Sequence, residues 1–161
     1  MKRNIIYIVI LAAMLWVPVK KLDVSKLLPI QVVSVYKEEN MVVIETDTQS
    51  RGVGVTVGQA LENLKDTANG IIYLDTAEYL MLSPDAEHTV ETLRQELKGS
   101  VRLCMTQAKI DPAEVVVFLG AHGQLPQLKS WKKGMELPVL HAFENSLTFL
   151  KKSKKGIDKR G

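Results

Sequence analysis

Three histidines and one cysteine are the side chains of this 161-residue chain best suited to binding a metal or attacking a substrate. Zinc sites need a second histidine or cysteine close by on the same face of an element. His88, His122 and His141 have no such neighbour, and Cys104 is the only cysteine, so a disulfide within the chain is also excluded. We therefore expect no metal and no cofactor.

His122 is the histidine with the most catalytic potential, because it lies in the glycine-flanked stretch 120–123. An imidazole in a flexible loop can act as a general base. No serine or cysteine stands near it in a recognisable nucleophile elbow, however. A surface histidine is the favoured interpretation. The alternative is a small enzyme or ligand-binding domain that uses His122 and the loop 120–138.

Cys104 lies within the stretch 101–105, where apolar residues alternate as in a strand. Its alternation with Arg102 predicts that the thiol lies on the outer face of the sheet. A structural thiol is favoured over a nucleophile, since a reactive thiolate needs an electropositive, accessible setting.

Gly52, Gly54 and Gly58 precede a helix start, where backbone amides can bind a phosphate. A dinucleotide-binding fingerprint would need glycine in place of Val57, and a P-loop would need lysine in place of Gln59. We interpret the glycines as a flexible loop that enters a capped helix.

Carboxylates recur in two places where acid–base chemistry is conceivable. Asp75 and Glu78 lie between two predicted strands, and the other group follows one face of a predicted helix. We favour solvated surface residues in both places over a catalytic pair. The helix face carries Glu87, Glu91, Glu96, Arg94 and Lys98.

Short apolar runs between polar turns predict the strands that position these side chains. The first two, over 30–35 and 41–44, form a hairpin around a polar turn. The others cover 71–74, 79–82 and 101–105.

Helical spacing of apolar residues predicts the remaining elements. Thr56 and Gln59 form a capping box before a helix that ends at 69–70. Ser83 as N-cap and Pro84 as first residue begin a second helix, which ends at Gly99. Residues 112–119 are assigned to a helix, although the β-branched run 115–117 leaves a strand open. A last amphipathic helix is expected from Leu140, Phe143, Leu147 and Leu150.

The fold class that follows is mixed α+β. We expect a small sheet of about four short strands packed against three to four helices, in one globular domain over 22–150. An N-terminal membrane helix over 1–21 precedes the domain, and a basic disordered tail over 151–161 follows it.

The uninterrupted apolar run 5–19 is flanked by basic residues on both sides, which is typical of an export or membrane segment. It is short for a bilayer-spanning helix, but no small-residue cleavage site follows it. A retained anchor is therefore favoured over a cleaved signal peptide, and both over a buried core helix. The predicted membrane-facing residues are Ile5, Ile8, Leu11, Leu15 and Trp16.

The C-terminal tail holds one apolar residue, Ile157, so it cannot pack onto a core. A solvated end is favoured, and the sharper alternative is contact with anionic lipid headgroups. The residues that would make this contact are Lys151, Lys152, Lys154, Lys155, Lys159 and Arg160.

The net charge of +3 is too small to indicate nucleic acid as a partner. Basic residues concentrate at the two ends, so the middle of the chain is acidic. We expect the acidic domain to be anchored at a membrane, with its globular part outside the cytoplasm, and to contact a membrane-embedded protein.

Four stretches resemble the N-terminal domain of Ger(x)C spore-germination proteins, the C subunits of germinant receptors. They are 27–33 (LLPIQVV), 54–64 (GVTVGQALENL), 72–83 (IYLDTAEYLMLS) and 136–140 (ELPVL). Family members open with a lipid-modified cysteine, where this chain has Lys20 and Lys21. The resemblance implies a non-enzymatic, membrane-associated partner domain that acts in spore germination or sporulation.

Overall fold

The structure, a computed structural model, describes residues 24–122, 124–143 and 146–149. The expected membrane helix over 1–21 and the basic tail over 151–161 lie outside the described residues. Within the described ranges, no helix is both long enough and apolar enough to cross a bilayer.

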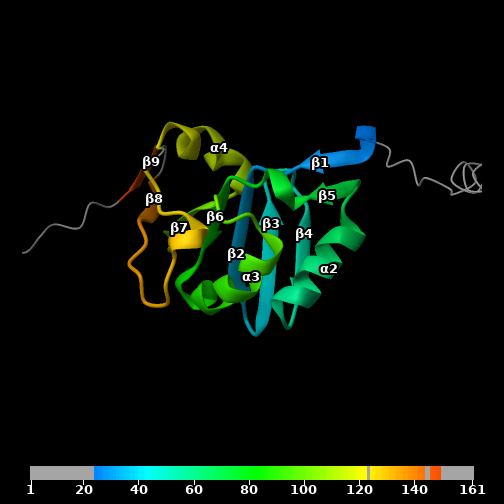
Figure 1. Cartoon of the computed structure of the whole chain (residues 1–161), viewed down its shortest axis with the longest axis horizontal. Helices are drawn as coiled ribbons and strands as arrows, with labels where there is room; N and C mark the ends of the chain where they lie inside the picture. The colour runs from blue at the N-terminus through cyan, green and yellow to red at the C-terminus, as the bar shows by residue number, and fades with distance from the viewer. Residues whose placement is uncertain (1–23, 123, 144–145, 150–161) are drawn as a thin grey trace, which may run out of the picture.

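A seven-stranded sheet forms the centre of the molecule (Figure 1). The strand order is β4-β3-β2-β6-β7-β8-β9. The four inner strands β2, β6, β7 and β8 are parallel, and the outer pairings are antiparallel. The strands are β2 (Val32–Glu38), β3 (Met41–Thr46), β4 (Arg51–Gly54), β6 (Tyr79–Leu82), β7 (Arg102–Thr106), β8 (Val139–Phe143) and β9 (Ser146–Phe149).

A separate two-stranded ribbon lies beside the sheet. Its parallel strands are β1 (Leu27–Pro29) and β5 (Ile71–Tyr73). Thr76 joins the ribbon to the start of β2, because its hydroxyl accepts a 2.9 Å hydrogen bond from the amide of Ile30.

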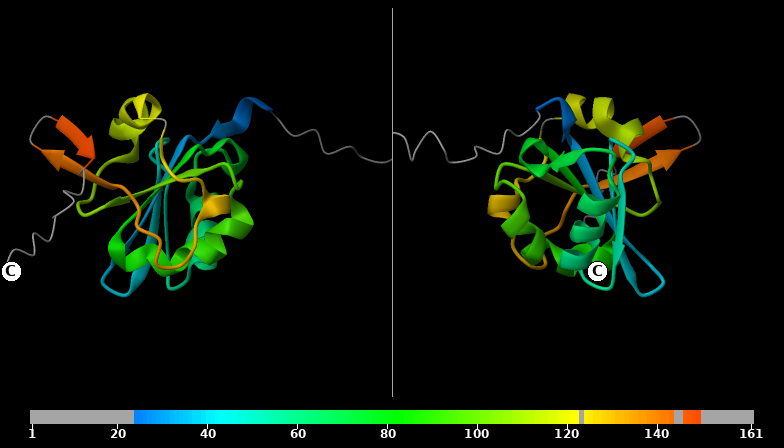
Figure 2. Two further views of the ribbon diagram at one scale, coloured as in Figure 1. Left: turned by 60° about the vertical axis from the view of Figure 1, so that its left-hand side comes forward. Right: turned by 90° about the vertical axis from the view of Figure 1, so that its right-hand side faces the viewer.

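Three α-helices pack on the two faces of the sheet (Figure 2). They are α2 (Val57–Thr67), α3 (Val90–Glu96) and α4 (Pro112–Ala121). Leu64 and Leu93 bring α2 and α3 into the larger apolar cluster, whereas Val115 and Leu119 of α4 belong to a smaller cluster on the other face. The described residues also form short 3₁₀ helices at Val24–Lys26, Leu74–Thr76, Pro84–Thr89 and Leu128–Ser130.

The predicted mixed α+β class is confirmed, but the expected sheet of about four strands is too small. The additional strands of the sheet are β4, β8 and β9, and the ribbon strand β1 is also absent from the prediction. β1 contains Pro29 and β4 contains two glycines, residues that are depleted in strands, so neither segment has a strand-like composition. The expected last helix covers β8 and β9.

The expected last helix is wrong, because residues 139–143 and 146–149 form the antiparallel pair β8–β9. Leu140 and Leu147 have helical spacing, yet β8 pairs with β7 through Met105 and Val139. This long-range pairing overrides the local pattern. Leu150 lies outside the described residues.

The helix starts are confirmed at two of three places. Thr56 accepts from the Gln59 amide at 3.3 Å, while the Gln59 side chain accepts from the Val55 amide at 3.1 Å. Asp111 accepts from the amide of Ala113 at 2.9 Å, so the helical assignment of 112–119 is confirmed.

The third helix start differs from the prediction. Ser83 makes no side-chain capping bond, and the segment begins as a 3₁₀ helix at Pro84 before α3 starts at Val90. The expected apolar stripe of this helix is nevertheless buried, since Ala86, Val90 and Leu93 are fully inaccessible.

The predicted glycine loop is also wrong, because Gly52 and Gly54 belong to strand β4. A Cβ atom on Gly52 would lie 2.6 Å from Cβ of Leu64 and would overlap the carbonyl oxygen of Ala60. The glycines therefore let α2 lie directly against β4, and they do not form a phosphate-binding loop.

Candidate functional site

A charged cluster occupies the α4 side of the sheet where β2, β3 and β4 run next to one another. Ser34 pairs with Glu45, and Glu45 pairs with Arg51, so the register places these residues side by side across three strands. Tyr36 lies two residues beyond Ser34 and therefore shares its face. Lys109 joins the cluster from the segment between β7 and α4.

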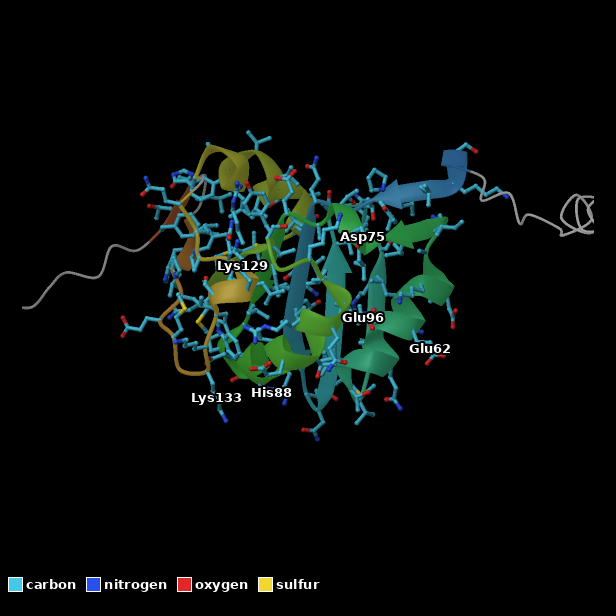
Figure 3. All side chains as sticks on the ribbon, viewed as in Figure 1. Glu62, Asp75, His88, Glu96, Lys129 and Lys133 are labelled. Atoms are coloured by element: carbon cyan, nitrogen blue, oxygen red, sulfur yellow. The ribbon has the colours of Figure 1, made fainter. Side chains whose placement is uncertain are left out.

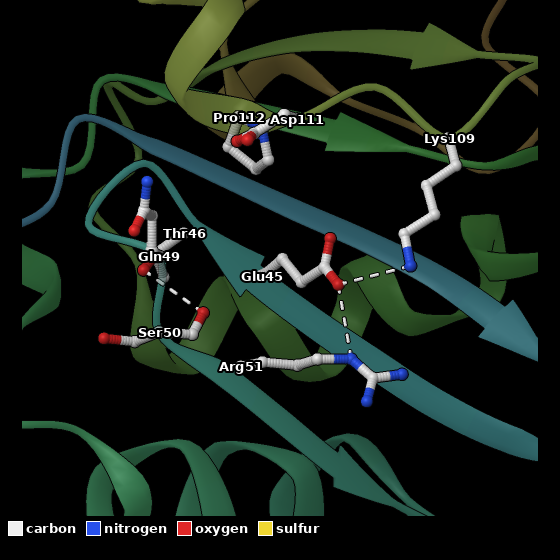
Figure 4. Close-up of a pocket in the computed structure, with 8 residues that line it drawn as sticks. All are labelled: Glu45, Thr46, Gln49, Ser50, Arg51, Lys109, Asp111 and Pro112. Atoms are coloured by element: carbon white, nitrogen blue, oxygen red, sulfur yellow. Dashed lines mark hydrogen bonds and ion pairs between the residues drawn. The ribbon is translucent and has the colours of Figure 1, made fainter.

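Glu45 is the centre of this cluster (Figure 4). The Tyr36 hydroxyl donates a 2.6 Å hydrogen bond to its Oε1. The same oxygen lies 3.2 Å from Nε of Arg51 and 3.5 Å from Nζ of Lys109. Only 17% of the Glu45 side chain is exposed, so its charge is held by three partners at one point of the sheet.

Glu38 forms a second anionic position for the same two cations. Its Oε2 lies 2.6 Å from Nη2 of Arg51, and its Oε1 lies 3.3 Å from Nζ of Lys109. The Lys109 ammonium also lies 5.0 Å from the ring centre of Tyr36, within the range of a cation–π contact. Two carboxylates and two cations thus form one connected network.

The pKa values of Tyr36, Arg51 and Lys109 are all raised in this network. The neighbouring Tyr36 side chain is the largest influence that raises the pKa of Lys109 and of Arg51, and nearby glutamates act in the same direction. Burial, followed by the bond to Glu45, raises the pKa of Tyr36. Lys109, Arg51 and Tyr36 therefore all keep their protons at neutral pH, which makes the cluster suited to charge recognition and poorly suited to proton transfer.

Two cavities open on either side of Lys109. The first, about 320 Å³, lies between the cluster and the start of α4 (Figure 4). The second, about 420 Å³, lies where β6 and β7 end. In parallel sheets this carboxyl edge is the usual place for a ligand. Residues that line the first are Glu45, Thr46, Gln49, Arg51, Lys109 and Asp111.

His122 does not lie in this cluster and has no nucleophile beside it among the described contacts. Its Nδ1 donates a 2.8 Å hydrogen bond to the carbonyl oxygen of Phe118. Its ring stacks on Phe118 at 4.1 Å between centroids and meets the ring of Phe149 edge-on. The imidazole thus packs at the end of α4 and has a structural role that accounts for its position.

Cys104 is fully buried in the cluster beneath α4, so the expectation of an outer-face thiol is wrong. Both faces of the sheet are covered at β7, which the alternating pattern could not reveal. Burial raises the pKa of the thiol to about 12. The structural assignment of Cys104 fits this setting, because the thiolate is almost absent at neutral pH.

The remaining candidates are dispersed over the surface. Figure 3 shows Asp75 near the β1–β5 ribbon. His88 lies far from the ribbon, in the 3₁₀ segment that precedes α3. Within the described residues, no group of three histidine, cysteine or acidic side chains is placed to hold a metal ion. The membrane and tail residues predicted above lie outside the described residues.

The charged cluster was not predicted from the sequence. Its members are spread from Tyr36 to Lys109, and none belongs to a local motif. The one available signal was Glu45, a charged residue that directly follows the β-branched run Val42–Ile44 within the same strand. A charged residue in such a strand indicates a face that is only partly covered.

Comparison of the chain with protein-family models, curated proteins and solved structures finds no match in any of the three.

Proposed function

We propose that this chain is a membrane-anchored, non-enzymatic interaction domain that docks onto a membrane-embedded protein outside the cytoplasm. The charged cluster is the observation that carries the docking proposal. Its Glu38, Arg51 and Lys109 side chains are 45%, 47% and 56% exposed, and they lie beside α4 with open cavities on both sides. The anchoring proposal comes from the apolar run 5–19.

The fold itself has little need of this cluster. The pairs of Glu38 with Arg51 and Lys109 are exposed, and exposed ion pairs contribute from zero to about 1 kcal/mol each to stability. Complementary charges across an interface, in contrast, orient the partner and set specificity. A fixed pattern of two carboxylates and two cations is therefore better explained by recognition of a charged protein surface than by a role in folding.

The resemblance to Ger(x)C proteins extends the proposal to spore germination or sporulation. The docking partner would then be a membrane-embedded receptor or transporter-like protein. The acidic body and the basic ends fit this arrangement, because the ends are attracted to anionic lipid while the body is repelled from it.

The enzymatic alternative has weaker support. His122 packs on Phe118 and Phe149, and burial keeps the Cys104 thiol protonated. The Nδ1 of His122 is also occupied by the hydrogen bond to the carbonyl oxygen of Phe118.

Charge reversal at Lys109 tests the docking site. A photoreactive Lys37→p-benzoylphenylalanine substitution at the exposed rim of the second cavity is introduced into the full-length protein in its native cells. We expect illumination to crosslink the chain to one membrane protein, which gives a single adduct band of higher mass. Adding Lys109→Glu should reduce that adduct at least about tenfold, because unpairing an interfacial charge costs several kcal/mol.

Lys65→Glu is the matched control for Lys109→Glu. Lys65 forms a similar exposed pair with Glu96 at 3.6 Å, but it lies on α2, on the opposite face of the sheet. Melting curves of both variants check that each remains folded at the temperature of the crosslinking assay. The docking proposal is wrong if Lys109→Glu leaves the adduct unchanged, or if Lys65→Glu reduces it equally.

A further inference from the structure

The β1–β5 ribbon has an apolar outer face. The register pairs Leu27 with Ile71 and Pro29 with Tyr73, while Leu28 and Ile72 pair between them. Ile72 is buried in the larger apolar cluster and Leu28 packs against it. Because side chains alternate along a strand, the other four residues share the face directed away from the core.

This face is open to solvent although the Tyr73 hydroxyl is the one polar side-chain group among its four residues. Ile71 is 43% exposed, Tyr73 is 41% exposed, and Pro29 is also exposed. A sheet face in contact with water normally carries polar residues. The ribbon differs from this rule, because its solvent-facing side is mainly apolar like its buried side. An exposed cluster of this kind indicates a contact surface.

The ribbon is also the first part of the domain after the apolar run. Val19 ends that run, and five residues later Val24 begins the 3₁₀ segment that leads into β1. Five residues span at most about 17 Å. If the run is in a bilayer, Val24 must lie within this distance of the end of the run, and the ribbon begins three residues after it, at Leu27. Figure 1 shows β1 and β5 together at the end of the molecule where the described chain begins.

The charges around this entry match an anionic membrane surface. Residues 20–26 carry Lys20, Lys21 and the exposed Lys26, which immediately precedes β1, against one acidic residue, Asp23. Each basic residue near an anionic surface contributes about 1 kcal/mol of attraction. Tyrosine is enriched at the level of the lipid headgroups, where its ring and hydroxyl are both accommodated.

We propose that the outer face of the ribbon, formed by Leu27, Pro29, Ile71 and Tyr73, lies in the interface of an anionic lipid bilayer. This inference rests on the anchoring part of the proposed function and adds a second contact to it. The ribbon orients the domain: with the anchor and this face both held by lipid, the body has a fixed side toward the membrane. Thr76 transmits that orientation to the sheet, because its hydroxyl lies 2.8 Å from the carbonyl of Tyr73 and accepts from the amide of Ile30.

Fluorescence quenching by brominated lipid tests this orientation. The full-length protein is inserted into vesicles of phosphatidylcholine and phosphatidylglycerol, with Ile71→Cys or Tyr73→Cys labelled by a thiol-reactive fluorophore. Cys104 is fully buried and should stay unlabelled, which the unsubstituted protein checks. Val55→Cys is the control, because Val55 is 65% exposed but lies between β4 and α2, at the end away from the ribbon (Figure 1).

We expect brominated lipid to remove most of the fluorescence at positions 71 and 73 and little at position 55. Flotation of the same vesicles separates the two proposals. A chain that floats with equal quenching at all three positions overturns the ribbon contact and leaves anchoring intact. Shielding of position 71 from aqueous iodide without quenching by lipid also overturns it, since a second protein copy would then cover the face. A chain that does not float contradicts the anchoring itself.

Discussion

Replacing Gly52 with alanine is expected to lower the free energy of unfolding by about 3 kcal/mol, the upper end of the range for overpacking a close contact. The new methyl group would overlap the carbonyl oxygen of Ala60 and lie 2.6 Å from the amide nitrogen and Cβ of Leu64. These atoms belong to the backbone and the first side-chain carbon of α2, so no rotamer change relieves the overlap. The helix would have to move away from β4.

Gly58→Ala is the control within the same helix. A Cβ atom at Gly58 meets nothing closer than 3.9 Å, the distance to Oγ1 of Thr56. Because alanine favours a helix over glycine, this variant should gain up to about 1 kcal/mol. Urea unfolding of the full-length protein in detergent, followed by circular dichroism, measures both. Equal stability of Gly52→Ala and the unsubstituted protein would show that α2 and β4 are not in direct contact.

Replacing Trp131 with alanine is expected to cost about 4 kcal/mol, as for other large buried aromatic residues. Trp131 lies in the long segment between α4 and β8 but is only 3% exposed. Its ring packs in the larger apolar cluster, and the Arg94 guanidinium lies 5.7 Å from the ring centre. Arg94 also donates hydrogen bonds to the carbonyls of Leu128 and Trp131, at 2.9 and 2.7 Å.

Trp131→Phe separates packing from hydrogen bonding. The indole Nε1 has no hydrogen-bond partner among the described residues, so phenylalanine loses volume but no bond. We expect a cost of about 1–2 kcal/mol, well below that of alanine. Unfolding of both variants by urea gives the comparison. A cost for alanine below about 1 kcal/mol would mean that the segment 122–138 is not held to the core by this ring.

Local patterns were sufficient for the elements that carry local signals. The capping box at Thr56 and the Asp111–Pro112 start both appear in the structure because their bonds form within four residues. The short apolar runs of β2 and β6 and the alternating run of β7 also predict strands that the structure contains, since the apolar residues that define them are buried by neighbouring elements.

Elements whose identity depends on distant partners were missed. β4 is a strand because it pairs with β3, and its glycines allow α2 to lie against it. β8 is a strand because β7 offers an edge to Val139. The charged cluster has the same origin, since Glu45, Arg51 and Lys109 meet only once the sheet register is set. These contacts join residues far apart in the sequence, so the spacing of residue types along the chain does not predict them.

We propose that residues 1–21 retain the chain in a membrane. Intact-mass measurement of the full-length protein, recovered from native membranes washed with alkaline carbonate, tests it most directly. We expect the protein to stay in the pellet with Met1 to Lys21 attached, because no small-residue cleavage site follows the apolar run. A mature chain that begins at Lys20 or later, released into the supernatant, would contradict it.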